Sequence, residues 1–242
     1  MTTVHEAQAT VLTGVPADAA QVLDHLLHER WSCRAYLPTE VSQVVIERLL
    51  SIAQRAPSWC NTQPWQLEIT SGEGTERFRA ALLAHIEATG GYSRPDYPMP
   101  EQYTGVHRDR RRVSGWQLYE AVGVARGDRA ASARQSAKNF ELFGAPHVAV
   151  ITVAKEQAAY GAVDSGIYIG AFLLAARSLG LGAIPQAALA RYAPFLRDYF
   201  VIDDSRNVLL AISFGYPDLD HPANSYRTER AAIKEVVRFH TD

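Results

Sequence analysis

The chain has few cysteines and almost no net charge. Its 242 residues include two cysteines, and its 24 basic against 26 acidic side chains give a formal net charge of −2. Cys33 and Cys60 cannot build a disulfide framework or a four-cysteine zinc site. The balanced charge gives no general attraction to nucleic acid or to an anionic membrane. We therefore expect a reducing, cytoplasmic location, no bound metal and no nucleic-acid partner.

Long apolar runs are also missing. No uninterrupted apolar stretch approaches the roughly 20 residues of a membrane-spanning helix, and the first residues lack the basic start and apolar run of a signal peptide. The apolar fraction is 47% and the charged fraction 21%, as in ordinary globular proteins. We expect no membrane partner, a flexible arm over residues 1–17, and one domain over residues 18–242.

Hydrophobic periodicity predicts the regular elements. Helices are expected from Asp18 as N-cap through Leu27, and over residues 42–56, 75–88, 108–122, 129–143 and 163–179. Strands are expected over residues 65–70, 147–153 and 208–214. The helix at 163–179 is apolar and carries small residues at Gly166, Gly170, Ala171 and Ala175, which favours a buried core helix or a dimer helix.

Two short segments carry the strongest chemical pattern. Arg30-Trp-Ser-Cys-Arg34 places two permanent cations and a hydroxyl at every second position, so Arg30, Ser32 and Arg34 share one face of an extended chain. Trp31 and Cys33 would then point into packing. Arginine suits a phosphate because its planar fork binds two oxygens and keeps its charge. Taken alone, however, this segment is also typical of an ordinary helix end.

The second segment, Pro57-Ser-Trp-Cys-Asn-Thr-Gln-Pro-Trp65, is a polar loop that runs into a strand. Together, in this order and spacing, the two segments resemble the signature of the nitroreductase family of FMN-dependent oxidoreductases. The likeness extends over residues 24–240, and the stretch Gly115-Trp-Gln-Leu-Tyr119 is similar to the nitrobenzoate reductase branch. Trp31 departs from the polar or basic residue that other members often carry there, which changes the packing near the phosphate.

The resemblance implies a set of cofactor contacts. Arg30 and Ser32 would bind the FMN phosphate together with Arg230 of the tail, or less well Arg227, while Trp31 lies beside them. Arg34 would lie near N1 and O2 of the ring. Asn139, or its neighbour Lys138, would touch the pyrimidine half. In the stretch Gly180–Ala188, the backbone amide of Ala187 or its neighbour Gln186 would face N5, with Ile184 and Pro185 against the ring; a helix C-cap with a short strand is the alternative for this stretch.

The same resemblance implies an α+β fold with a central, mostly antiparallel sheet flanked by helices. It also implies a homodimer in which the C-terminal arm embraces the partner. Two FMN molecules would lie at the interface, with Pro57, Ser58, Asn61 and Gln63 contributed by the other chain. No side chain would be catalytic, because flavin N5 performs the chemistry.

Residues 89–128 form an expected insertion whose role the sequence leaves open. Prolines and tyrosines alternate over residues 89–106, which suits either a packed surface loop or a lid over a flat substrate. The cluster Arg108-Asp-Arg-Arg-Arg112 suits a solvated or interface face, with the extra phosphate of NADPH as the alternative ligand.

The expected reaction is alternating hydride transfer from NADPH or NADH, through the flavin, to a small electron-poor aromatic acceptor, with a nitroaromatic first. Three alternatives remain open: a family member that reduces quinones, enones or halogenated phenols, one that cleaves reduced flavin, and a flavin-binding protein without turnover. The sequence does not choose between NADH and NADPH.

Overall fold

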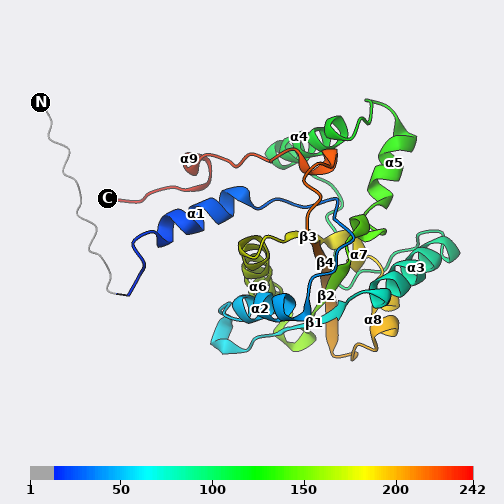
Figure 1. Ribbon diagram of the computed structural model, residues 1–242, viewed down its shortest axis with the longest axis horizontal. Helices are drawn as coiled ribbons and strands as arrows, with labels where there is room; N and C mark the ends of the chain where they lie inside the picture. The colour runs from blue at the N-terminus through cyan, green and yellow to red at the C-terminus, as the bar shows by residue number, and fades with distance from the viewer. Residues whose placement is uncertain (1–13, 242) are drawn as a thin grey trace, which may run out of the picture.

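An antiparallel sheet lies at the centre of the chain in the computed structural model, which describes residues 14–241 (Figure 1). Within these residues the strands are β1 (Trp65–Thr70), β2 (His147–Ala154), β3 (Gly182–Gln186) and β4 (Arg206–Gly215). Their order is β1-β2-β4-β3, and every neighbouring pair is antiparallel. Strands predicted at 65–70, 147–153 and 208–214 are therefore confirmed, as is the α+β class. The short strand weighed only as an alternative, β3, forms one edge of the sheet, and β1 forms the other.

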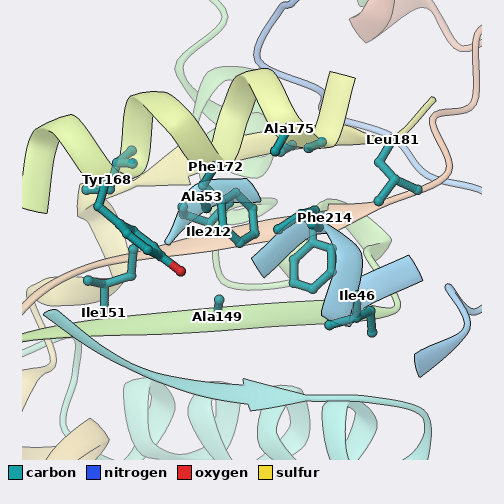
Figure 2. Packing of buried hydrophobic residues seen from close by; sticks show 14 of the residues in the cluster. Ile46, Ala53, Ala149, Ile151, Tyr168, Phe172, Ala175, Leu181, Ile212 and Phe214 are labelled. Atoms are coloured by element: carbon teal, nitrogen blue, oxygen red, sulfur yellow. The ribbon is translucent and has the colours of Figure 1, made fainter. Parts of the chain in front are cut away.

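Helices α2 (Gln43–Ala53) and α6 (Ala158–Ser178) cover one face of the sheet (Figure 1). Figure 2 shows Tyr168 and Phe172 pointing from α6 toward the strands, where they meet Ile151, Ile212 and Phe214. Phe172 is fully buried, and its ring lies edge-on to that of Phe214 at 5.6 Å between centroids. The helix pattern predicted over 163–179 begins five residues earlier, at Ala158.

Helices α3 (Glu73–Ala88), α7 (Ala187–Ala190) and α8 (Ala193–Phe200) cover the opposite face. Phe78 and Leu82 of α3 are fully buried there against Val148 and Val150 of β2. Because both faces of β2 are covered, its residues form a nearly continuous buried run. The expectation of a central strand at 147–153 therefore holds.

Helices α4 (Gly105–Ala121) and α5 (Arg129–Ala137) lie together at one end of the molecule (Figure 1). The prediction of a helix over 129–143 is wrong in its second half. After Ala137 the chain forms the short turn η2 (Leu142–Gly144), in which Leu142, Phe143 and Gly144 all have positive φ. In this turn the side chains of Leu142 and Phe143 are both buried.

Helix α1 (Ala19–Glu29) begins after Asp18 as predicted, although the Asp18 side chain makes no capping hydrogen bond. Its apolar face is open: Val22, Leu23 and Leu27 are each about half exposed. Residues 14–17 before it are exposed, and residues 1–13 of the expected flexible arm lie outside the described residues.

Helix α6 is long and apolar enough, by length and composition, to cross a membrane, which the sequence interpretation did not anticipate. Its buried side packs on the sheet and on α2, as expected of a core helix. Its other side, with Val163 and Ile167 at 56% and 44% exposure, is uncovered, and so are Gly166 and Gly170. Of the four small residues singled out on this helix, Gly166 and Gly170 therefore lie on an open face, whereas Ala175 is buried in the core and Ala171 packs against it.

Candidate functional site

The segment Arg30–Arg34 runs extended from the end of α1 along the sheet edge. Ser32 forms a parallel bridge with Ala183 of β3, and the Cys33 N–H donates to the Ala183 carbonyl at 3.3 Å. The Cys33 side chain is buried against Gly182, where an added Cβ would lie 2.7 Å from Sγ. Glycine at 182 is therefore required for the close approach that places this segment.

A cleft of about 480 Å³ opens beside the segment. The structure brings together here the Arg30–Arg34 segment and the C-terminal tail. The cleft is lined by Arg30, Trp31, Ser32, Arg34, Tyr226, Arg227, Thr228 and Arg230, with Asp24, Leu27 and His28 of α1 and Ser114 of α4. The arginines outnumber the single carboxylate, that of Asp24, which pairs with His28 at 3.3 Å. The cleft therefore has the charge of an anion site.

Arg30 has the clearest features of an anion-binding residue. Its Nε is buried and has no hydrogen-bond partner among the described residues. Burial lowers the pKa of Arg30, and the nearby positive charge of Arg230 lowers it further. Two cations held together without a counter-charge are costly unless an anion binds between them. A phosphate group would satisfy the unpaired N–H and relieve the repulsion.

Trp31 and Arg227 make a contact that was not expected. Trp31 lines the cleft, and the Arg227 guanidinium lies over its ring at 4.2 Å from the centroid. Arg227 Nη1 also donates to the carbonyls of Asn224 and Tyr226. The prediction that Trp31 points into packing holds in part, because its side chain packs against the buried cluster that contains Cys33 and Tyr36. It missed that the same indole lines the cleft and supports a tail arginine. Arg230 Nη1 likewise donates to the Thr228 carbonyl and hydroxyl and to the Glu229 carbonyl. Arg230 is favoured as the tail cation of the anion site because its charge acts on Arg30, whereas Arg227 is stacked on Trp31.

A second cavity, of about 230 Å³, shares Arg34 with the first. Its walls are Ile184, Pro185, Gln186 and Ala187, with Ala188, Asn139, Gln135, Ser136 and Phe143, and with Gly115, Leu118 and Tyr119 of α4. Arg34 itself donates from Nη1 to the Ser32 carbonyl at 3.1 Å and to the Tyr226 hydroxyl at 3.0 Å. A cationic cleft and a partly apolar slot joined by one arginine suit a flat molecule that carries a phosphate.

Gln186 is held away from the slot by its own partners. Its Nε2 donates to the Asn139 carbonyl at 2.8 Å, and its Oε1 accepts from the Ser213 hydroxyl. Residues 186–187 therefore offer the slot mainly backbone. The amide of Ala187 stands at the first position of α7, where no intrahelical acceptor exists. Asn139 lines the slot, whereas Lys138 lines a neighbouring cavity and pairs with Glu141 at 2.6 Å. The geometry thus favours Asn139 over Lys138.

The second motif loop is strained and firmly held. Within the turn η1 (Trp59–Asn61) and just after it, Cys60, Asn61 and Gln63 all have positive φ, which is uncommon for residues with a side chain. The Ser58 hydroxyl accepts from the Gln63 N–H at 2.9 Å, and Gln63 Nε2 donates to Asn61. Such strain persists where surrounding bonds fix it, and it gathers at functional sites.

This loop lies at the opposite end of α6 from the cleft. The Trp59 N–H donates to Asp164 near the helix start, while Arg177 near its end lies over Trp31. Thirteen residues of helix separate Asp164 from Arg177, which is roughly 20 Å. Neither cavity that Arg34 joins is lined by a residue of 57–63. One chain therefore does not bring Pro57, Ser58, Asn61 and Gln63 to Arg30.

The stretch 89–106 is tied down at its centre. The Asp96 carboxylate accepts from Arg197 and from the Val208 N–H, both at 2.7 Å. These bonds favour a packed loop for this part, while the following helix α4 forms a wall of the slot. In the basic cluster, Arg108 pairs with Asp109 and Arg110 with Glu235, as expected of a solvated or interface face.

Sequence reasoning missed several lining residues. Tyr226 belongs to a polar tail with no periodicity to mark it. Leu118 and Tyr119 were taken as part of a helix and of the Gly115–Tyr119 stretch, with no role in a pocket. Among the described residues, no cluster of three or more His, Cys, Asp or Glu side chains could hold a metal ion.

Comparisons with known proteins point in one direction. A family model described as the nitroreductase family matches residues 27–216. Nitroreductase NfnB of Mycolicibacterium smegmatis is 35% identical over 232 residues, covering 95% of this chain and 97% of that protein. A 4-nitrobenzoate reductase of Pseudomonas putida is 32% identical, covering 89% and 94%. The crystal structure of the FMN-dependent NfnB from Mycobacterium smegmatis in complex with NADPH superposes with a TM-score of 0.86, at 35% identity, covering 93% of this chain and all of that one.

Proposed function

Since the chain belongs to the nitroreductase family, we propose that it is an FMN-dependent oxidoreductase that takes hydride from NADPH or NADH and reduces a nitroaromatic acceptor. The observation that carries this function is the pair Arg30 and Arg230, with the buried Nε of Arg30 unpaired among the described residues. The pair lies in a cleft that Arg34 connects to a partly apolar slot. Its relatives are named as nitroreductases and nitrobenzoate reductases.

The residues present fit FMN. Arg30, Ser32 and Arg230 would hold the phosphate, Arg34 would lie near the N1 and O2 edge, and Asn139 would bind the pyrimidine half. Ile184 and Pro185 would pack against the ring, with the Ala187 amide directed at N5. When bound, FMN supplies the atom that accepts and gives hydride. The chain's own groups bind, orient and exclude water, and a cation near N1 favours the anionic reduced form.

We further propose that the site is completed by a second copy of the chain. Pro57, Ser58, Asn61 and Gln63 lie at the far end of α6 and would be supplied by the partner. An apolar surface suited to such a contact is exposed on α1, on α6 and on the C-terminal arm, where Ile233, Val236 and Phe239 are 70%, 66% and 80% exposed. Exposed apolar surface on this scale is typical of an interface.

Two further features belong to the same proposal. Both cysteines are free thiols, which suits a cytoplasmic enzyme. Residues 89–128 form an insertion in an otherwise single domain of residues 18–242. Helix α4 within it lines the slot and would shape the pocket for a small aromatic acceptor.

The experiment is an anaerobic absorbance spectrum of the purified full chain, recorded alone, after NADPH, and then after 4-nitrobenzoate. We expect flavin bands that bleach with NADPH and return with the nitro compound. Bleaching that only a quinone, an enone or a halogenated phenol reverses would keep the reductase and replace the acceptor. Flavin that NADPH and NADH leave oxidised would indicate a binding protein without turnover. No flavin bands, even after incubation with FMN, would refute the proposal.

A further inference from the structure

Asn224 is a buried polar side chain with every hydrogen-bonding position occupied. It ends the short turn η4 (Pro222–Asn224) and is 3% exposed. Its Oδ1 accepts from the Arg34 N–H at 2.8 Å and from the Trp31 indole N–H at 3.3 Å. Its Nδ2 donates to the carbonyls of Ala35 at 2.9 Å and of Asp218 at 2.7 Å.

These partners require an amide. The Arg34 N–H and the Trp31 indole can only donate, and the two carbonyls can only accept. An aspartate at 224 would place an anionic oxygen against two carbonyl oxygens. An alanine would remove the partner that Asn224 gives to the Arg34 N–H, the Trp31 indole and the Asp218 carbonyl, whereas the Ala35 carbonyl would still accept from the Asp218 N–H at 3.1 Å. Each buried polar group left without a partner costs about 1–3 kcal/mol.

Asn224 lies where the C-terminal tail meets the Arg30–Arg34 segment. Two residues further, the Tyr226 hydroxyl accepts from the Arg34 guanidinium, and the next residue, Arg227, lies over the Trp31 ring. Three contacts in four residues therefore fix the tail along this segment. Arg230 follows three residues later, where its charge acts on Arg30.

Arg230 and Arg30 are both positively charged and repel each other, so other contacts must hold Arg230 in place. The carboxylate of Asp24 in the same cleft is engaged with His28. The contacts that could offset this repulsion are the neutral hydrogen bonds of Asn224 and the stacking of Arg227 on Trp31. A site whose cations are already in place binds an anion without the cost of ordering them.

We propose that Asn224 is a positioning residue that pre-organises the phosphate site by fixing the tail, so that Arg230 stands beside Arg30 before the ligand arrives. Trp31 is its partner in this task, because the indole N–H donates to Asn224 and the ring lies under Arg227. This inference rests on the proposed function, because the phosphate is that of FMN.

The test is the affinity of the flavin-free full chain for FMN and for riboflavin, which lacks the phosphate, measured by flavin fluorescence in Asn224→Asp. We expect the dissociation constant for FMN to rise about tenfold or more, as for the loss of one charge-assisted hydrogen bond. Riboflavin affinity should stay within about twofold. Equal losses for both flavins, or unchanged FMN affinity, would overturn the proposal.

A double-mutant cycle with Arg230→Gln separates positioning from a general loss of structure. If Asn224 acts through Arg230, the double variant should bind FMN no more weakly than Arg230→Gln alone, whereas additive losses would contradict this. Asn207→Asp, the same change at the start of β4, is the matched control. If Asn224→Asp does not fold, Trp31→Phe is used in its place, because Trp31→Phe removes one donor to Asn224 and keeps a ring under Arg227. The Trp31→Phe variant should show a smaller loss of affinity, confined to FMN. A wild-type chain that binds neither flavin would refute the proposed function and not the role of Asn224 alone.

Discussion

Replacing Arg30 should separate flavin affinity from stability. In Arg30→Ala the cleft loses the half-buried guanidinium whose Nε has no partner among the described residues. A hydrogen bond to a charged group contributes about 1.5–3 kcal/mol, so FMN affinity should fall about 10- to 150-fold. Riboflavin, without a phosphate, should lose little. Fluorescence titration of both flavins measures the difference.

The flavin-free chain should respond in the opposite sense. Burial and the charge of Arg230 both lower the pKa of Arg30, which means that the folded state without an anion disfavours this cation. Removing the charge therefore relieves a cost of folding. The variant Arg30→Met isolates this effect, because it keeps most of the apolar stem. Its flavin-free form should melt no lower than wild type, and a gain of about 1 kcal/mol would raise the midpoint by about 2–4 °C.

These two results test the reasoning jointly. If Arg30→Met kept full FMN affinity, the guanidinium would not bind the phosphate. If its flavin-free form melted several degrees below wild type, the charge of Arg30 would stabilise the fold, and the unpaired Nε would not mark an anion site. Arg30→Lys adds a control, because it keeps the charge and loses the planar fork, so its FMN affinity should be intermediate.

Two other perturbations address the core. Phe172→Ala empties a fully buried position against Phe214 and should lower the free energy of unfolding in urea by about 3–5 kcal/mol. Leu83→Ala, on the partly exposed face of α3, should lower it by about 0.5 kcal/mol or less. Similar losses in the two variants would contradict the core described above. Burial lowers the pKa of His147, and its Nε2 accepts from the Val41 N–H at 2.9 Å, so the folded state favours the neutral ring. The stability from this ring is present above the unfolded-state pKa of about 6.5 and is lost as pH falls through it toward the folded-state pKa. Unfolding midpoints should therefore drop more from about pH 7.5 to about pH 5.5 in wild type than in His147→Gln, and equal drops would refute this assignment.

The sheet and most helices could be predicted because local pattern and tertiary packing agree in them. Trp65–Thr70 alternates and His147–Ala154 is continuously apolar, and each is paired as such a strand should be. The pattern failed after Ala137, where positive φ at Leu142 and Phe143 reverses the chain. Neither residue type signals that conformation, so only the surrounding core selects it.

The candidate site divides in the same way. The phosphate role of Arg30 and Arg34 was predicted from their segment together with the Pro57–Trp65 loop and the family resemblance, because arginines at alternate positions alone are also typical of a helix end. The role of Asn224 was not predictable, since its four partners come from residues 31–35 and 218 and its own neighbours are unremarkable polar residues. The second contact of Trp31 was missed for a related reason: alternation gives the side on which a residue lies, and it does not show that Arg227 returns to stack on the ring.

The separation of the two motif loops along α6 has a thermodynamic consequence. If Arg30 of one chain and Ser58 of another enclose the same flavin, then FMN binds the dimer and not the monomer, and it must strengthen association. Free FMN at a hundred times its dissociation constant adds about 2.7 kcal/mol per site, hence up to about 5 kcal/mol for two sites. Sedimentation at nanomolar chain concentration should therefore show dimers with FMN and a larger monomer fraction without it. Ile167→Glu, which places a charge on the exposed face of α6, should shift both forms toward monomer and weaken FMN binding in parallel. A dimer constant that FMN leaves unchanged would mean that each flavin is held within one chain, and the strained loop at Cys60–Gln63 would then need another purpose.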